Sequence, residues 1–477
     1  MKVLFQRIGK NKTLPIKSFF IFESHHKLIP MENKNIAVVG AGPVGSLLAV
    51  LLAKKGLKVD VFERRPDLRK AKTIEGKSIN LALSNRGFKA LRLAGFENEI
   101  KDISIPMYGR QMHDVQGNLT FQPYGKEGEA IFSVSRGELN RKLMNLADKY
   151  PSIHYRFNHA CKDVDLKENK IIFKDSNTEV RKEYKYDYIF GADGAFSAVR
   201  GRLQKTSLFN YSQEYLEHGY KELYFPPNPD GTHCFDKNCL HIWPRGNFML
   251  IALPNLDGSF TVTLFFPLKG EVSFESLDTP NKVFSFFEKT FPDTLKHLPD
   301  LKEDFFNNPT STLVTIRCNP WNYKNQVLLV GDASHAVVPF YGQGLNAGME
   351  DCSIFLEAIE NNGNNIGNAI EKFGKDRVAD GEAIADLALY NYIEMRDLTG
   401  DKDFLLQKKI ERKFSNLYPE KWIPLYSRVT FSNHPYSEAL REGEKQEAIM
   451  KEIMKMNGIH EKWDSQEVID KILELTS

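Results

Sequence analysis

The sequence predicts an α/β fold in which a parallel sheet that binds a dinucleotide is interrupted by an inserted antiparallel sheet and followed by a helical region. Three observations support this prediction. A β-α-β unit occupies residues 35–63, closely spaced hairpins occupy residues 240–267, and helical patterns dominate from about Asn346 onward. The chain has 477 residues, more than one core usually holds, so two packed regions and a tail are expected.

The β-α-β unit carries a glycine pattern between its first strand and its helix. An apolar run at residues 35–39 leads into Gly40, Gly42 and Gly45, and the second strand ends in Glu63. The three glycines permit a tight turn, close approach of a pyrophosphate and close packing of the helix on the sheet, and Glu63 can accept hydrogen bonds from a ribose. The pattern predicts a Rossmann-type dinucleotide site, the alternative being a glycine-rich turn without a ligand.

Two more apolar strands end in an aspartate. Residues 188–190 lead to Asp193, and residues 327–330 lead to Asp332. Loops at the carboxyl ends of parallel strands bind ligands, and a carboxylate there can accept hydrogen bonds from the ribityl chain of a flavin. Either aspartate could instead cap a helix. Residues 342–346 then open another helix and offer backbone donors to a flavin.

Between these motifs, three short strands at residues 240–244, 248–254 and 260–267 are joined by turns, which indicates an inserted antiparallel sheet. We expect a disordered or over-annotated leader at residues 1–32, an FAD-binding domain at 33–205 and 310–375, an antiparallel-sheet substrate domain at 206–309 with contributions from 76–125, and a helical C-terminal region at 376–477.

Composition narrows the class of protein. There are 64 basic and 62 acidic side chains, and this balance gives no reason to expect a nucleic acid or an anionic membrane as partner. Five scattered cysteines predict free thiols in a reducing compartment, which we take to be the cytoplasm. His233, Cys234, Cys239 and His241 lack a Cys-x-x-Cys pair, so no metal site is expected.

The sequence contains a glycine motif, an Asp-Gly motif and a Gly-Asp motif, in that order. In this it resembles the flavoprotein aromatic hydroxylases that share the p-hydroxybenzoate hydroxylase fold, in which the three motifs occur in the same order. Further segments resemble the kynurenine 3-monooxygenases within that family; they are residues 78–83, 105–107 with Arg110, 240–245, 338–344, 390–396 and 423–426. The resemblance covers residues 35–432. It implies bound FAD, NADPH and O2 as co-substrates, and hydroxylation of L-kynurenine to 3-hydroxy-L-kynurenine through a flavin C4a-hydroperoxide, in tryptophan degradation and NAD synthesis.

Together with the glycine and aspartate motifs, the resemblance predicts where FAD is bound, with Cys161 contributing through its backbone. The predicted FAD-binding residues are Gly40, Gly42, Val44, Gly45, Phe62, Glu63, Arg64, Arg65, Ala82, Arg136, Cys161, Asp193, Asp332, Gly344, Leu345 and Asn346. No side chain is predicted to act as acid, base or nucleophile, because the cofactor carries the chemistry.

The predicted substrate residues divide into a polar end and an apolar wall. Arg110 can bind the amino-acid carboxylate of kynurenine through two parallel bonds, and Tyr124 can add a phenolic donor. Asn391 lies on the apolar face of a helix, where it is either a satisfied core amide or a substrate contact, with Tyr426 beside it. Strand alternation places Met249, Ile251, Leu253, Thr263 and Phe265 on one face, which is usually plain core. The resemblance implies that this face forms the apolar wall of the aromatic-ring pocket, together with Leu240, Pro339 and Phe340.

Animal members of the family end in hydrophobic anchoring segments, whereas residues 442–477 here are charged, so we expect no membrane anchor. The spacing of Ile449, Ile453 and Met456 predicts a helix that covers the substrate region. Two other functions stay open: a related flavin hydroxylase of an anthranilate- or salicylate-like acid, and a flavin-binding interaction protein without turnover. Whether the chain forms a homodimer, and whether NADPH is preferred to NADH, also stays open.

Overall fold

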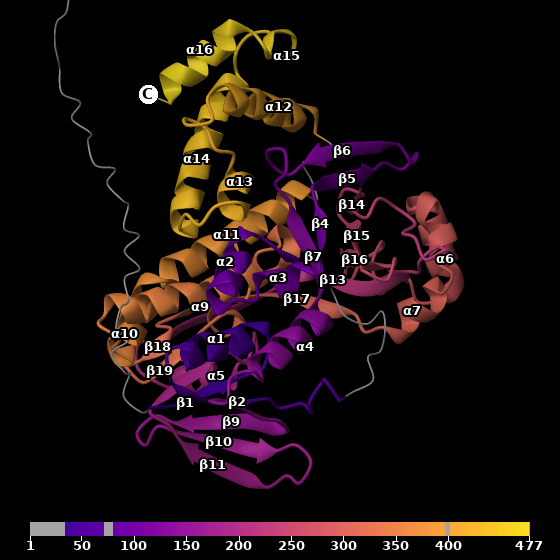
Figure 1. The fold of residues 1–477 in the computed structure, drawn as a ribbon. Helices are drawn as coiled ribbons and strands as arrows, with labels where there is room; N and C mark the ends of the chain where they lie inside the picture. The colour runs from indigo at the N-terminus through magenta and orange to yellow at the C-terminus, as the bar shows by residue number, and fades with distance from the viewer. Residues whose placement is uncertain (1–33, 71–79, 396–400, 477) are drawn as a thin grey trace, which may run out of the picture. The chain divides into compact units, whose positions relative to one another are not determined.

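A computed structural model describes residues 34–70, 80–395 and 401–476 (Figure 1). The leader expected at residues 1–32, residues 76–79 of the segment expected to join the substrate domain, and Arg396 of the resembling segments lie outside the described residues.

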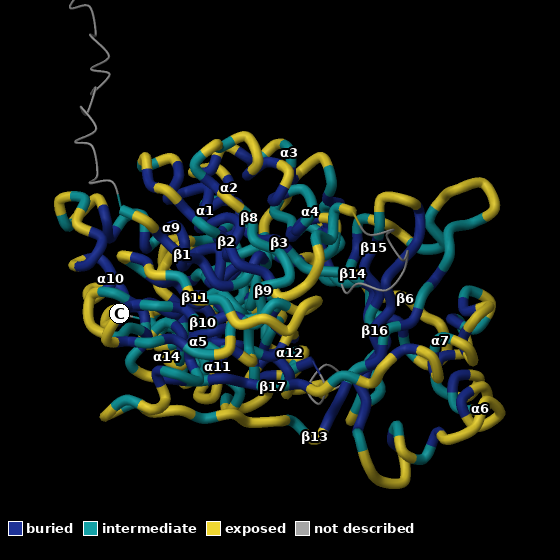
Figure 2. Tube along the Cα trace, turned by 90° about the horizontal axis from the view of Figure 1, so that it is seen from below, coloured by how far each residue is buried: buried dark blue, intermediate teal, exposed yellow. Residues whose placement is uncertain are grey.

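A six-stranded sheet carries the dinucleotide motifs. Its strands, in spatial order, are β18 (Asn322–Tyr323), β19 (Val327–Leu329), β12 (Tyr188–Gly191), β1 (Asn35–Val39), β2 (Lys58–Phe62) and β8 (Ile153–Arg156). All neighbouring pairs from β19 to β8 are parallel. The helix α1 (Pro43–Lys54) is buried from Gly45 to Ala53 in the same core as these strands, and Figure 2 shows this region as deeply buried.

Helices and small sheets surround this core. The helices are α2 (Asn85–Ala94), α3 (Glu97–Lys101), α4 (Arg136–Ala147), α5 (Ala198–Leu203), α9 (Gly344–Asn361) and α10 (Ile366–Asp376). One small sheet joins β3 (Asn80–Leu83), β7 (Ile131–Ser135) and β4 (Ile105–Met107). The other was not anticipated from the sequence and joins β11 (Arg181–Lys185), β10 (Lys170–Asp175) and β9 (His159–Asp165). It packs on β2, since the rings of Phe62 and Phe173 stack at 4.1 Å.

A seven-stranded sheet contains the predicted hairpins. Its order is β17 (Ser311–Asn319), β13 (Asn210–Phe225), β16 (Phe260–Pro267), β15 (Met249–Pro254), β14 (Cys239–Pro244), β5 (Gly109–His113) and β6 (Leu119–Pro123). One face packs against α6 (Pro280–Thr290), the 3-10 turn η1 (Pro292–His297) and α7 (Leu301–Asn307). In Figure 1, α6 and α7 lie beside this sheet.

The register of this sheet decides which side chains share its other face. Arg110 lies opposite Leu240, Ile251 lies opposite Thr263, and Met249 lies opposite Phe265. Because successive side chains of a strand point to opposite faces, these pairs all project away from α6 and α7. The predicted wall and Arg110 therefore lie on one surface.

The C-terminal region consists of helices α11 (Val378–Ile393), α12 (Lys402–Leu417), α13 (Leu425–Thr430), α14 (Tyr436–Ile453), α15 (Ile459–Lys462) and α16 (Gln466–Leu475). The first turn of α14 packs with α11 beside the substrate face. Ile449, Ile453 and Met456 instead pack with α12 and α16 in a separate core, so the expectation that they cover the substrate region is wrong. Ile449 and Ile453 do lie on a helix, but α14 ends at Ile453, so Met456 lies beyond it.

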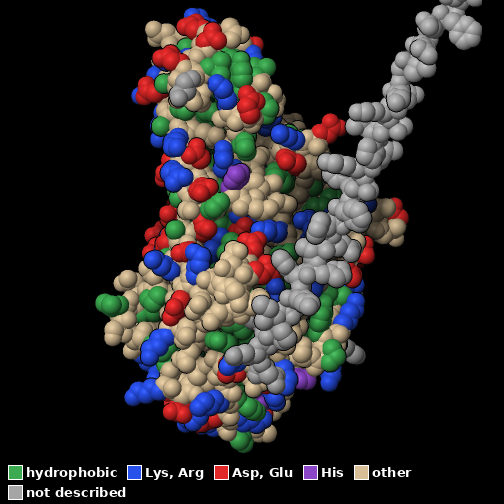
Figure 3. Space-filling model, turned by 60° about the vertical axis from the view of Figure 1, so that its left-hand side comes forward, with side chains coloured by type: hydrophobic (Ala, Val, Ile, Leu, Met, Phe, Trp, Pro, Cys, Tyr) green, Lys and Arg blue, Asp and Glu red, His purple; other side chains and the backbone are tan. Residues whose placement is uncertain are grey.

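None of the helices in the described ranges combines the length and apolarity needed to cross a bilayer. On the face drawn in Figure 3, basic and acidic side chains are interspersed, as the balance of 64 basic and 62 acidic residues leads one to expect.

Candidate functional site

Adjacent parallel strands bring the three sequence motifs to one edge of the six-stranded sheet. β2, β1, β12 and β19 are neighbours in that order and run in the same direction. Glu63, Gly40, Asp193 and Asp332 follow their carboxyl ends, which is where open α/β sheets bind ligands. The arrangement is that expected of a dinucleotide site.

The glycine turn leaves room where a phosphate would need it. A Cβ on Gly40, which has φ +107°, would lie 2.3 Å from the carbonyl oxygen of Ala192, and a Cβ on Gly45 would lie 2.0 Å from that of Gly40. A Cβ on Gly42 would meet nothing within 4 Å. Gly40 and Gly45 are thus needed for packing, whereas the space beside Gly42, at the N-terminus of α1, is open to a ligand.

Glu63 is held in place by its neighbours. Its carboxylate accepts a hydrogen bond from the backbone N–H of Ala41 at 3.2 Å and another from Nε of Arg65 at 2.9 Å. The Glu63 side chain is buried, while Arg64 and Arg65 are exposed. The carboxylate is therefore fixed at the end of β2 beside the glycine turn, which suits a ribose acceptor.

Asp193 serves as a helix cap and also keeps a free acceptor. Its Oδ2 accepts hydrogen bonds from the backbone N–H groups of Ala198 at 2.7 Å and Val199 at 3.4 Å, at the start of α5. Its Oδ1 is buried and has no hydrogen-bond partner. Burial raises the pKa of this carboxyl, and it raises that of the Cys161 thiol on β9, to which the charge of Asp193 adds. Asp193 can therefore cap α5 and still accept a hydrogen bond from a ligand, so the two interpretations of the sequence are compatible.

The Gly-Asp loop is held in place by a buried residue that the sequence analysis did not identify. Asp332 is exposed at the first position of α8 (Asp332–His335). The preceding Gly331 donates its N–H to Oδ2 of the fully buried Asp351 at 2.9 Å. Asp351 also pairs with His335 at 2.6 Å and with Arg377 at 3.0 Å. An aspartate in a helix core gave no signal of this role, because its partners come from other elements.

Asn346 uses its whole amide within the protein. Its Oδ1 accepts from the backbone N–H of Ser84 at 2.8 Å, and its Nδ2 donates to the carbonyls of Ala82 at 2.7 Å and Gly342 at 2.8 Å. The side chain therefore joins the end of β3 to the turn before α9. At Asn346, only the backbone is left to bind a ligand.

The remaining predicted FAD residues lie around this edge. Phe62 is buried at the end of β2, Arg136 is exposed at the start of α4, Leu345 is partly buried in α9, and Gly344 begins that helix. Val44 packs toward Gly331, since a Cβ added to Gly331 would lie 3.3 Å from the side chain of Val44. The free Oδ1 of Asp193, the open space at Gly42 and the fixed Glu63 fit a bound dinucleotide such as FAD.

On the substrate face, Arg110 faces a stack of three tyrosines. Its guanidinium carbon lies 5.5 Å from the ring centroid of Tyr124 and 5.0 Å from that of Tyr426. The rings of Tyr124 and Tyr426 stack at 5.3 Å, and Tyr426 stacks on Tyr341 at 5.5 Å. Tyr341 was not among the predicted site residues, although it lies next to the predicted Phe340 and within the resembling segment 338–344.

Two polar groups of this stack have no hydrogen-bond partner. Arg110, which is half-buried, makes no ion pair with any carboxylate in the described ranges, although the charge of Glu394 acts on it. Both its Nε and the hydroxyl of Tyr124 are buried without a hydrogen-bond partner. Burial raises the pKa of the Tyr124 phenol well above its ordinary value, so the hydroxyl stays a neutral donor. A buried guanidinium is costly without an anion, and a carboxylate ligand would satisfy both groups.

Three of the predicted wall residues, Leu240, Ile251 and Leu253, share an apolar cluster with Ala82 of the predicted FAD edge. Leu253 and Tyr124 form this cluster with Met107 and Ile131, and partly buried side chains complete it; they include Ala82, Leu240, Ile251 and Tyr426. Met249 and Phe265 belong to the neighbouring cluster with Phe340. Thr263 is buried on the same face, and Pro339 is exposed. Ala82 thus links the predicted cofactor residues to the predicted wall.

Asn391 is a satisfied core amide beside this wall. Its Nδ2 donates to the carbonyl of Phe340 at 2.7 Å and to the sulfur of Met395 at 3.2 Å. Phe340 stacks on Tyr392 at 4.2 Å and lies 4.9 Å from Phe265. Asn391 therefore positions the Phe340 turn, whether or not it also touches a substrate.

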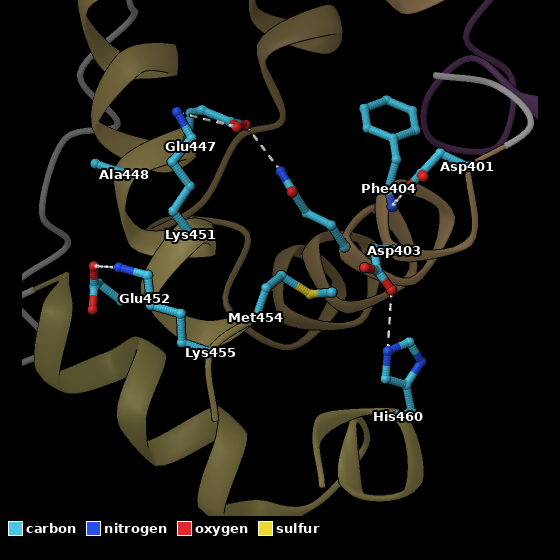
Figure 4. Close-up of a pocket in the computed structure, with 11 residues that line it drawn as sticks. Asp401, Asp403, Phe404, Glu447, Ala448, Lys451, Glu452, Met454, Lys455 and His460 are labelled. Carbon is cyan, nitrogen blue, oxygen red and sulfur yellow. Dashed lines mark hydrogen bonds and ion pairs between the residues drawn. The ribbon is translucent and has the colours of Figure 1, made fainter. Parts of the chain in front are cut away.

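A groove of about 530 Å³ lies elsewhere, between α12, α14 and α15 (Figure 4). His460 and Asp403 pair across it at 3.1 Å, and no predicted site residue is among those that line it. In the part of the chain that the structure describes, no cluster of three or more His, Cys, Asp or Glu residues could hold a metal ion.

Comparison with known proteins agrees with this geometry. Residues 33–362 match the family model described as FAD binding domain. The kynurenine 3-monooxygenase of Christiangramia forsetii is 52% identical over 93% of this chain and 99% of its own, and that of Sus scrofa is 43% identical over 88% of each.

Among solved structures, 2-methyl-3-hydroxypyridine-5-carboxylic acid oxygenase aligns with a TM-score of 0.63 at 17% identity, over 78% of this chain and 94% of that chain. A likeness at this identity concerns the fold alone. Together with the family match, it confirms the predicted fold class: a Rossmann-type FAD-binding domain, an inserted antiparallel sheet and a helical C-terminal region.

Proposed function

The chain belongs to the kynurenine 3-monooxygenases, and from that premise we propose that it is an FAD-dependent enzyme that hydroxylates L-kynurenine to 3-hydroxy-L-kynurenine with NADPH and O2. The observation that carries the proposal is Arg110, which makes no ion pair with a carboxylate among the described residues, keeps a buried Nε without a hydrogen-bond partner, and shares the substrate face with an apolar wall. An aromatic ring that bears an amino-acid carboxylate matches both features.

FAD would be held at the carboxyl edge of the six-stranded sheet. The N-terminus of α1 and the space beside Gly42 suit the pyrophosphate, and Glu63 suits a ribose. The free Oδ1 of Asp193 and the exposed carboxylate of Asp332 offer acceptors for further hydroxyl groups. Bound FAD supplies the redox chemistry, taking a hydride from NADPH and activating O2.

The protein's own part is to bind and orient the substrate. Arg110 can grip the carboxylate through two parallel bonds, and the hydroxyl of Tyr124 can donate a third. Because both groups lie on a rigid sheet or stack on neighbouring rings, they hold the amino-acid end in one place. Fixing that end also fixes the ring, and orientation of this kind contributes to rate.

The apolar wall supports the same proposal. Met249, Leu253 and Phe265 are buried on the substrate face, so an aromatic ring bound against this face would have apolar surroundings that exclude water. The amino group on the ring of kynurenine already enriches the carbon that is hydroxylated. No protein base is therefore needed near the ring, which agrees with the apolar character of this face.

The test is spectroscopic and catalytic. Purified protein should show a flavin absorption spectrum, L-kynurenine should accelerate NADPH oxidation, and mass spectrometry should find the 3-hydroxy product. Anthranilate and salicylate, tried in the same assay, distinguish a related hydroxylase. Acceleration by one of these acids and not by kynurenine would overturn the proposed substrate, while a protein that takes up no flavin would overturn the class.

We also propose a cytoplasmic location. All five cysteines are free, two of them partly accessible and three buried, which suits a reducing compartment. Fractionation of the native cell would test it.

A further inference from the structure

Behind the substrate face of the seven-stranded sheet, two buried histidines form a chain of hydrogen bonds. His113 on β5 and His241 on β14 are 1% and 2% exposed. Nδ1 of His113 lies 3.0 Å from Oδ2 of Asp293, and its Nε2 lies 2.9 Å from Nδ1 of His241. Nε2 of His241 lies 2.8 Å from the carbonyl oxygen of Asp236. Both ends of the chain are therefore acceptors.

Counting protons gives the charge of the pair. Each end needs an N–H that donates outward, and the contact between the rings needs one more proton. These three protons exceed the two that a pair of neutral imidazoles carries. With the carboxylate of Asp293 ionised, the three hydrogen bonds can form together only if the pair holds one extra proton and a single positive charge, which that carboxylate faces directly.

The surroundings place the extra proton on His113. Its ring stacks on the indole of Trp243 at 4.0 Å, a geometry that stabilises a cation, and Trp243 donates its Nε1–H to the same Oδ2 of Asp293 at 2.8 Å. Burial, only partly opposed by the hydrogen bond to Asp236, lowers the pKa of His241 to about 4. His241 is thus the neutral relay between His113 and the carbonyl.

Other ionisable groups around the pair do not replace Asp293 as its counter-ion. Arg245 donates to the carbonyl of His113 at 3.0 Å, and Asp114 at the end of β5 is bonded to Asn118. Burial raises the pKa of Cys239 to about 12, which leaves a neutral thiol near Asp236.

Two groups of η1 complete the surroundings. Burial lowers the pKa of His297, which favours its neutral form. Burial alone would raise the pKa of Asp293, but the hydrogen bonds from His113 and Trp243 outweigh it and leave that pKa low. Asp293 is therefore the ionised partner of the pair.

We propose that His113 and His241 are positioning residues that share one extra proton and so tie β5 and β14 to Asp293 behind the substrate site. The two strands are paired in register, with Arg110 directly opposite Leu240 on the other face. The imidazolium holds these strands together and against η1. Its loss would loosen the strand that presents Arg110 to the substrate.

The kinetic consequence, which rests on the proposed function, is a pH-dependent KM. When the pair loses its proton as the pH rises, one hydrogen bond and the ion pair with Asp293 are lost together. We expect KM for kynurenine to rise about five- to tenfold, the loss of affinity that corresponds to the net free energy of one hydrogen bond. Because Arg110 grips the end remote from the reacting ring, kcat should change little.

The first experiment counts the protons directly in the FAD-loaded full chain. Nitrogen-15 NMR of histidine-labelled enzyme, assigned with His113→Gln and His241→Gln, should show at about pH 6 one imidazole protonated on both nitrogens and one neutral. Two neutral rings at that pH would overturn the proposal. This measurement needs no turnover, so it decides the proton count even if kynurenine proves not to be the substrate.

The second experiment compares pH profiles of KM with that of the native enzyme, so that ionisation of the substrate cancels. Asp293→Asn keeps an acceptor but removes the charge, and the rise in KM should move to lower pH. His241→Gln can still accept from His113 and donate to Asp236, so its profile should stay close to that of the native enzyme. An Asp293→Asn profile identical to the native one would overturn the proposal.

A matched control lies outside this chain of hydrogen bonds. His233 bonds to the carbonyl of Asn255 at 2.7 Å and does not touch the pair. His233→Gln should leave the pH profile of KM unchanged, and a shift equal to that of Asp293→Asn would show that the effect is general and sink the proposal. Failure of the proposed function would look different, since native enzyme would then give no kynurenine-dependent NADPH oxidation at any pH.

Discussion

The guanidinium carbon of Arg110 lies 5.0 Å from the ring centroid of Tyr426, so an inner strand of the seven-stranded sheet meets a helix of the C-terminal region at the substrate face. The tyrosine stack extends this junction to Tyr341, which follows the Gly-Asp motif. Three separate parts of the sequence therefore build the polar end of the site. This explains why a change in the C-terminal helices should affect substrate binding.

Arg110→Ala should weaken kynurenine binding about ten- to a hundredfold, because it removes a charge-assisted contact of roughly 1.5–3 kcal/mol. The effect should fall on KM, with kcat less changed, since the carboxylate lies away from the reacting ring. Steady-state kinetics of NADPH oxidation measure both.

Arg92→Ala is the matched control for this variant. Its guanidinium is largely exposed and pairs with Glu97 at 2.6 Å, so the substitution should leave KM unchanged. Equal KM values for native enzyme and Arg110→Ala would remove Arg110 from the site.

Gly42→Ala and Gly45→Ala should fail in different ways. A Cβ on Gly42 meets no protein atom within 4 Å, so this variant should fold but should lose flavin, because the methyl group occupies the space for the pyrophosphate. A Cβ on Gly45 would lie 2.0 Å from a backbone oxygen, so that variant should fail to fold. Flavin content per polypeptide and the unfolding temperature distinguish the two outcomes.

Gly201→Ala serves as the control for the glycine variants, since this helical glycine has nothing within 4 Å of its Cβ and lies outside the turn. It should keep full flavin and the native unfolding temperature or a slightly higher one. Full flavin content in Gly42→Ala would contradict the placement of the pyrophosphate.

The sequence anticipated those parts of the molecule that local patterns encode. Gly40, Glu63 and Asp193 each follow an apolar strand, so strand order alone brings them to one edge. The sheet of β9, β10 and β11 was missed because β11 consists mostly of charged residues and lacks apolar alternation.

Side-chain contacts between distant elements could not be predicted from the sequence, for a different reason. Tyr341 matters because it stacks on Tyr426, and His113 matters because it meets His241 and Asp293. Each of these side chains is unremarkable in its own segment. They gain partners only in the folded protein, where β5 pairs with β14 and α13 packs against the sheet.

Asn391→Ala should both destabilise the fold and impair the wall. The amide donates to the buried carbonyl of Phe340 at 2.7 Å, and a buried carbonyl left without its donor costs about 1–3 kcal/mol. The unfolding midpoint in urea measures that loss, and kcat/KM for kynurenine should fall with it as Phe340 shifts. If instead stability is unchanged while KM rises, Asn391 binds substrate directly and does not position Phe340.

Asp351→Asn should destabilise the fold more than Asn391→Ala does. Burial alone would raise the pKa of Asp351, but His335 and Arg377 outweigh it and keep that pKa low, so the carboxylate is ionised in the folded protein. Its contribution is present at neutral pH and is lost as the pH falls through that lowered pKa. Removing one partner of a buried ion pair costs about 3–5 kcal/mol, and here it also weakens the bond to the N–H of Gly331.

Urea unfolding at neutral pH measures this loss, and flavin content should fall too, because Gly331 leads into Asp332. Asp386→Asn is the matched control: its carboxylate is 54% exposed and pairs with Arg317, so the change should cost at most about 1 kcal/mol. The difference between the two variants should vanish in acid, where both carboxylates are protonated. Equal losses at neutral pH would mean that Asp351 does not hold the Gly-Asp loop through its charge.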